Sequence, residues 1–83
     1  MPLSAAGEAM FERLKAWRLE RAREANVPPY VVMHDSVLRQ LAYLQPTAED
    51  ELYGVKGLGP SKIGRYGREV LELLADDPDA AEE

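Results

Sequence analysis

The chain has 83 residues, of which 46% are apolar and 30% charged, with no cysteine and a formal net charge of −5. This length suffices for one small domain, and the lack of cysteine excludes a disulfide scaffold and thiolate zinc sites. No apolar run has the length of a membrane span and the N-terminus does not resemble a signal peptide, so we expect a cytoplasmic, monomeric protein or a piece of a longer one.

A first helix is predicted from about Gly7 to Ala25, after a flexible stretch of residues 1–6. Its apolar side chains recur at helical spacing and define one stripe. The stripe consists of Met10, Phe11, Leu14, Trp17, Arg21, Ala22 and Ala25. The other positions mix acidic and basic side chains, which indicates a solvated face with local ion pairs.

The letters NVPPY end this helix, because two consecutive prolines cannot continue it. A short turn through residues 30–33 is expected next. A second helix is then predicted, capped by Asp35 or Ser36 and ended by Pro46. Its apolar side comprises Val37, Leu38, Leu41, Ala42 and Leu44.

A third, very short helix is predicted with Thr47 as its cap and Asp50 completing a weak capping box, and Gly54 closes it. The three carboxylates of residues 49–51 lie in its first turn. One helical turn points them in different directions, so a metal-dependent nuclease site is not supported. The helix dipole accounts for them instead.

A fourth helix is predicted from Pro60 to about Ala75, since proline is favoured at the first helical position. Gly64 and Gly67 interrupt it at a cost of up to about 1 kcal/mol each. This cost suggests a kink, two abutting helices, or the close approach of another backbone. The fold class is therefore all-α, with four or five helices around one core that is expected to include Trp17, Tyr43, Tyr53 and Tyr66.

The stretch GVKGLGPSKIGRYG, residues 54–67, gathers five glycines and three cations without an acid, and Arg68 follows directly. A phosphate-binding loop of nucleotide hydrolases is excluded because Pro60 occupies the lysine position. A dinucleotide fingerprint is excluded because Lys62 occupies the third glycine position. Two readings remain open: an anion site at the start of the Pro60 helix, or a tight turn with solvated cations.

The sequence resembles the HRDC domain, which occurs in RecQ-type DNA helicases and in RNase D. The resemblance rests on NVPPYVVMHDSVLRQLA, on Pro46, and on ELYGVKGLGPSKIGRYGREVLELL, and it extends over roughly residues 11–74. VPPYVV is closer to the RecQ branch. The resemblance implies a compact five-helix bundle with a glycine turn before the fourth helix. It also implies a non-catalytic role in binding single-stranded or branched DNA and modulating a helicase core of the same chain.

No catalytic, metal-binding or cofactor-binding residue is predicted. The resemblance implies that Tyr30 in the proline turn, and Lys56, Lys62 and Arg65 around the glycine turn, bind nucleic acid. Gly57, Gly59 and Arg68 complete the expected nucleic-acid-binding residues. Tyr30 would stack on a base, with packing against the first helix as an equal alternative. His34, the only histidine, is interpreted as part of a helix start.

Charge leaves the function open between two classes. Residues 1–75 carry ten cations and ten acids, so the net charge comes entirely from residues 76–83, which we expect to form a disordered tail. A nucleic-acid-binding module is usually basic, so docking onto a helicase core or a partner protein is the alternative to DNA binding. A third hypothesis is that the tail folds back and competes with DNA for the cations.

Overall fold

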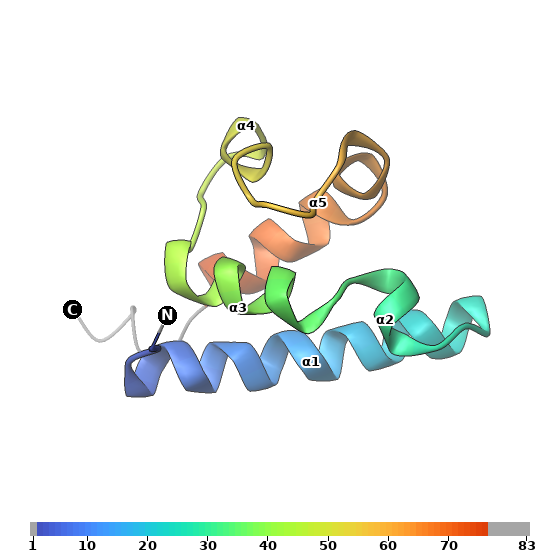
Figure 1. Ribbon diagram of the computed structural model, residues 1–83, viewed down its shortest axis with the longest axis horizontal. Helices are drawn as coiled ribbons and strands as arrows, with labels where there is room; N and C mark the ends of the chain where they lie inside the picture. The colour runs from blue at the N-terminus through green and yellow to red at the C-terminus, as the bar shows by residue number, and fades with distance from the viewer. Residues whose placement is uncertain (1, 77–83) are drawn as a thin grey trace.

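The computed structural model describes residues 2–76, which form five helices without a strand (Figure 1). The helices are α1 (Ala5–Ala25), α2 (Pro29–Val32), α3 (Asp35–Leu44), α4 (Glu49–Leu52) and α5 (Pro60–Ala75). The all-α class and the five-helix bundle are confirmed. Because the turn after the prolines is itself a helix, the helix after the glycine turn is the fifth rather than the fourth.

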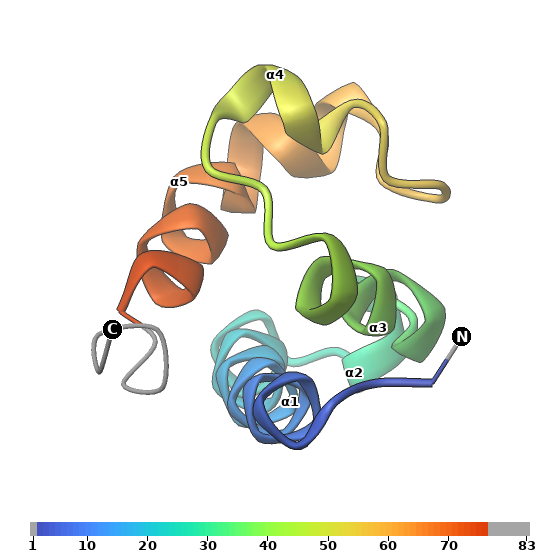
Figure 2. The ribbon, with the colours of Figure 1, turned by 90° about the vertical axis from the view of Figure 1, so that its left-hand side faces the viewer.

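The long helix α1 supports the bundle. The elements α2 and α3 run back along it, and α5 descends from α4 until its C-terminal end approaches α1 (Figures 1 and 2). The buried side chains form one core drawn from every helix and from the loop before α5. No helix of the described chain is both long and apolar enough to span a bilayer.

The first helix begins two residues before the predicted start. The hydroxyl of Ser4 accepts a hydrogen bond from the backbone N–H of Gly7 at 3.0 Å, which satisfies one of the free donors of the first turn. Ala5 and Ala6, expected in a flexible stretch, are therefore helical. The helix ends at Asn26, whose φ of 59° is the left-handed conformation that asparagine tolerates.

The start of α3 differs from the prediction for a reason that lies in α1. The N-cap is His34, not Asp35 or Ser36, and its side chain makes no capping bond. The guanidinium of Arg18 forms an ion pair with the carboxylate of Asp35 at 2.7 Å and also donates a hydrogen bond to the carbonyl of Met33 at 2.9 Å. Asp35 therefore joins α3 to α1 instead of capping its own helix.

The predicted capping box of α4 is also wrong. Ala48 is the N-cap, and no side chain caps the helix. Thr47 instead donates its backbone N–H to the carboxylate of Glu51 at 2.8 Å, so the acid that reaches back to Thr47 is Glu51 rather than Asp50.

Three side chains that were expected in the core are exposed: Tyr43 at 53%, Leu44 at 52% and Tyr53 at 57%. At 100° per residue, Tyr43 falls on the face of α3 opposite Val37, Leu38, Leu41 and Ala42. Leu44 is the last residue of α3, where the chain turns away. Tyr53 follows the last residue of α4.

The two glycines of α5 have different environments, and the helix runs through both. Gly67 is buried, and a Cβ there would lie 3.1 Å from Cδ1 of Leu52, so α4 packs closely at this point. The close approach is made by a side chain rather than by another backbone. Gly64 is exposed, and a Cβ there would meet nothing within 4 Å.

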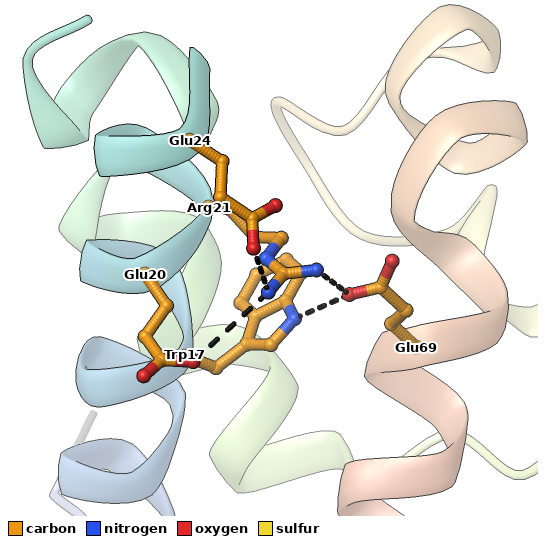
Figure 3. A network of polar contacts seen from close by, with 5 residues as sticks. All are labelled: Trp17, Glu20, Arg21, Glu24 and Glu69. Carbon is orange, nitrogen blue, oxygen red and sulfur yellow. Dashed lines mark hydrogen bonds and ion pairs between the residues drawn. The ribbon is translucent and has the colours of Figure 1, made fainter. Parts of the chain in front are cut away.

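A polar network joins α5 to α1 (Figure 3). The indole N–H of Trp17 and the guanidinium of Arg21 both donate to Oε1 of Glu69, at 2.9 and 3.1 Å. Arg21 also pairs with Glu24 at 2.9 Å on its own helix. Trp17 is half-buried with its ring edge-on to Tyr66, at a centroid distance of 5.6 Å, so both aromatic residues pack against the core as predicted.

The end of α5 is held to α1 by Asp76. Its carbonyl accepts a hydrogen bond from Arg13 at 2.8 Å, and its carboxylate lies 3.6 Å from the same guanidinium. Asp76, expected as the first residue of the tail, is therefore ordered against the bundle. The rest of the predicted tail, residues 77–83, lies outside the described residues.

Candidate nucleic-acid interface

The loop between α4 and α5 is a sequence of tight turns fixed by its apolar residues. Val55 and Leu58 are buried, and Leu58 donates its N–H to the carbonyl of Val55 at 3.1 Å. Between them Gly57 has a φ of +91°, and a Cβ there would lie 3.2 Å from Cγ2 of Val37. Glycine is therefore required at 57. Gly59 has an ordinary φ of −94° and open space around it.

The side chain of Gln40 holds the loop to α3. Its amide nitrogen donates to the carbonyl of Lys56 at 2.8 Å, and its amide oxygen accepts from the N–H of Lys56 at 2.9 Å. One side chain thus satisfies both backbone groups of one residue. Sequence reasoning missed Gln40 because 16 residues separate it from Lys56 and no local pattern links the two.

The start of α5 offers backbone donors. Gly59 is the N-cap, no side chain caps the helix, and Pro60 occupies its first position. The first intrahelical bond runs from the N–H of Ile63 to the carbonyl of Gly59 at 3.0 Å. The N–H groups of Ser61 and Lys62 precede that bond and lie at the positive end of the helix dipole.

Four cations lie in the loop before α5 and along its first nine residues, and we call them the cationic patch: Lys56, Lys62, Arg65 and Arg68. Lys62 is partly exposed and the other three are exposed. None of the four forms an ion pair with a carboxylate of residues 2–76. The three on α5 lie within roughly a third of the helix circumference, on the side away from the core. The guanidinium of Arg65 lies 5.8 Å from the ring centroid of Tyr66.

The proline turn presents an aromatic side chain to solvent. Tyr30 is 59% exposed, so the alternative of a half-buried tyrosine packed on the first helix is wrong. Its ring is stacked with that of His34 at a centroid distance of 6.0 Å and an interplanar angle of 27°. Sequence reasoning assigned His34 a role only in starting a helix and missed its contact with Tyr30.

Helix α3 connects the proline turn to the glycine loop. His34 is its N-cap, Val37 contacts Gly57, and Gln40 binds Lys56. With a rise of 1.5 Å per residue, Val37 and Gln40 lie about 4.5 and 9 Å along the axis from His34. The loop projects beside α3 in Figure 2. Lys56 is thus bonded to α3 through Gln40, and the ring of Tyr30 stacks on His34, the N-cap of the same helix.

Comparison with known proteins identifies the family. The family model of the HRDC domain matches residues 7–74, most of the chain. The chain belongs to the HRDC family, as its resemblance predicted. HRDC is an accessory domain of helicases and of RNase D and not itself a catalytic domain.

Among its relatives are two kinds of helicase. The chain is 43% identical over 67 residues to the ATP-dependent DNA helicase RecQ of Bacillus subtilis, and equally to the ATP-dependent DNA helicase UvrD2 of Mycobacterium tuberculosis. It is 33% identical over 76 residues to ribonuclease D of Acidiphilium cryptum. The alignments cover 81%, 81% and 87% of this chain, but only 11%, 10% and 19% of the relatives.

Proposed function

We propose that this domain is an accessory DNA-binding module of a RecQ-like ATP-dependent helicase. It binds single-stranded or branched DNA weakly, as a monomer, and so modulates the motor during DNA repair and recombination. The phosphates contact the cationic patch and the backbone donors at the start of α5, and a base stacks on Tyr30. The proposal carries with it a cytoplasmic location.

The observation that supports it best is the separation of free cations from paired ones. Four cations without an ion pair in residues 2–76 lie in the loop before α5 and along its first nine residues, and the backbone N–H groups at the helix start also favour an anion. The loop that carries Lys56 is fixed by Gln40 and by Gly57. A strand would therefore meet a preformed surface, and less ordering of the protein would oppose binding.

The test is a titration of the domain against oligo(dT) at several salt concentrations. Four phosphate contacts predict a log–log slope of about −3, from roughly −0.7 per neutralised phosphate on a single strand. Absence of binding at low salt, or binding without a salt dependence, would exclude the proposed interface. The Arg23→Ala variant is a matched control, because Arg23 is exposed on α1 and forms no ion pair within residues 2–76.

A second candidate function is docking onto the helicase core or a partner protein. The acidic net charge favours it, and so do the exposed side chains of Tyr43, Leu44 and Tyr53, which the core does not need. In a full-length helicase that contains this domain, deletion would then change the ATPase or unwinding rate, although the isolated domain binds no DNA. A motor that is indifferent to the deletion would count against docking.

The hypothesis of a competing tail concerns residues outside the described part of the chain. Asp76 is bound to Arg13 at the C-terminal end of α5, whereas the start of α5 lies roughly 24 Å away along a 16-residue helix, and Arg68 of the cationic patch about 12 Å away. Seven further residues reach at most about 25 Å. Truncation after Asp76 tests the idea: tighter DNA binding at low salt would support it, and an unchanged affinity would exclude it.

A further inference from the structure

The imidazole of His34 has no structural role that its position explains. It is exposed, it donates no capping bond to α3, and it forms no hydrogen bond or ion pair with residues 2–76. Its contact is the near-parallel stack on Tyr30. Both residues are exposed, so the stacked pair presents aromatic surface to solvent at the junction of α2 and α3.

The backbone beneath this surface is held rigidly. Val32 and Met33 lie between Tyr30 and His34 in the sequence, and each is only 1% exposed. The guanidinium of Arg18, whose side chain is only 11% exposed, binds the residues on both sides of His34: the carbonyl of Met33 and the carboxylate of Asp35. Pro29 restricts φ at the start of α2. The backbone that carries the two rings is therefore positioned before any ligand arrives.

Bases of every type have a π-face, and single-strand-binding proteins use exposed aromatic rings as sequence-tolerant stacking platforms. Resting on the proposed function, we propose that Tyr30 and His34 form one stacking platform for unpaired nucleobases, in which His34 contacts a base itself. The cationic patch then holds phosphates, and the platform distinguishes a strand with bases from a polyanion without them.

The experiment compares two oligonucleotides of equal length and equal phosphate number, oligo(dT) and a strand of abasic spacers. The wild-type domain is expected to bind oligo(dT) more tightly. His34→Ala should weaken binding to oligo(dT) by about fivefold or more, the effect of losing one base stack, and should leave binding to the abasic strand unchanged. His34→Phe keeps an aromatic ring and should retain most of the affinity.

The Tyr30→Ala background tests whether His34 contacts a base itself or only supports the ring of Tyr30. If His34 stacks on a base itself, His34→Ala weakens oligo(dT) binding further in that background. No further loss there, an equal loss on both strands, or no loss at all would overturn the inference. Thermal unfolding of each variant confirms that the fold is intact, and His34→Phe keeps the test decisive if His34→Ala is unstable.

The outcomes also separate this inference from the proposed function. If the wild-type domain binds both strands equally and with the predicted salt dependence, the phosphate interface stands and the platform is wrong. If the wild-type domain binds neither strand at low salt, both proposals are wrong. Tyr43→Ala serves as a matched control, because Tyr43 is similarly exposed but lies on the solvent face of α3.

Discussion

The cations of α1 and α3 differ from those around the start of α5 in what they contact. Arg13, Lys15, Arg18, Arg21 and Arg39 each pair with a carboxylate of the described chain, and four of these pairs join separate parts of the bundle. Arg23 is the exception on α1, without an ion pair in residues 2–76. The cationic patch has no such partners. The domain is neutral over residues 1–75, yet four of its five cations without an ion pair in residues 2–76 lie in the glycine loop and the first nine residues of α5. A low total charge therefore does not by itself argue against a local anion site.

From this comparison we expect that removing a paired cation lowers the stability of the domain, whereas removing a cation of the patch leaves its stability nearly unchanged. Arg18→Ala removes a largely buried guanidinium that bonds Met33 and Asp35, so it should lower the free energy of unfolding by about 2–3 kcal/mol, the range for hydrogen bonds to charged groups. Urea denaturation measures this loss. Arg65→Ala should change stability by less than about 0.5 kcal/mol. Equal losses in the two variants would break the distinction.

The glycine loop should depend on Gly57 and not on Gly59. Gly57→Ala places a side chain at a φ of +91° and 3.2 Å from Val37, so we expect a destabilisation of about 1–2 kcal/mol. Gly59→Ala should cost only a few tenths of a kcal/mol, because the φ of −94° suits alanine and no neighbour lies within 4 Å. This small cost arises because alanine is a poorer N-cap residue than glycine. Thermal unfolding of both variants checks the order, and a larger effect at Gly59 would contradict it.

Gln40 should act on DNA binding through Lys56. Gln40→Ala removes both bonds that fix the backbone of Lys56, with a stability loss of about 1 kcal/mol. It should weaken oligo(dT) binding as Lys56→Ala does. In a double-mutant cycle the two effects should not add, because each removes the same phosphate contact. Full additivity would show that Gln40 affects binding by another route.

The smallest expected effect is a gain of stability. Gly64→Ala adds a methyl group where nothing lies within 4 Å, in a regular exposed position of α5, and should stabilise the domain by up to about 1 kcal/mol. Gly67→Ala is the matched contrast, since its methyl group would press on Leu52 and should destabilise. Thermal unfolding of the pair tests this, and a gain at both positions would contradict the packing of α4 on α5.

The sequence predicted the helices well because their signals are local. Pro60 marks the start of α5, and the apolar spacing of α3 identifies four of its buried residues, whereas α2 was expected only as a short turn. The errors arose where tertiary contacts replaced a local rule. Asp35 is a good capping residue by type, but Arg18 binds it from another helix. Tyr43 is apolar enough for a core, yet its angular position on α3 already indicated solvent.

The candidate site was predictable in part. Glycine and positive charge in residues 54–68 indicated an anion site, and the exposed Tyr30 fits its expected stacking role. The sequence could not show that Lys56 is held by Gln40, or that the ring of His34 lies against that of Tyr30. Nor could it show which cations would be free, since that depends on which carboxylates the fold brings near each one.

The most direct test of the account is the salt dependence of oligo(dT) binding after removal of two patch cations. Lys62→Ala/Arg65→Ala should make the log–log slope shallower by about 1.4, from roughly 0.7 for each phosphate contact, whereas Arg23→Ala should leave it unchanged. A slope that the double variant does not alter, or that Arg23→Ala alters as much per charge, would contradict a DNA interface at the start of α5.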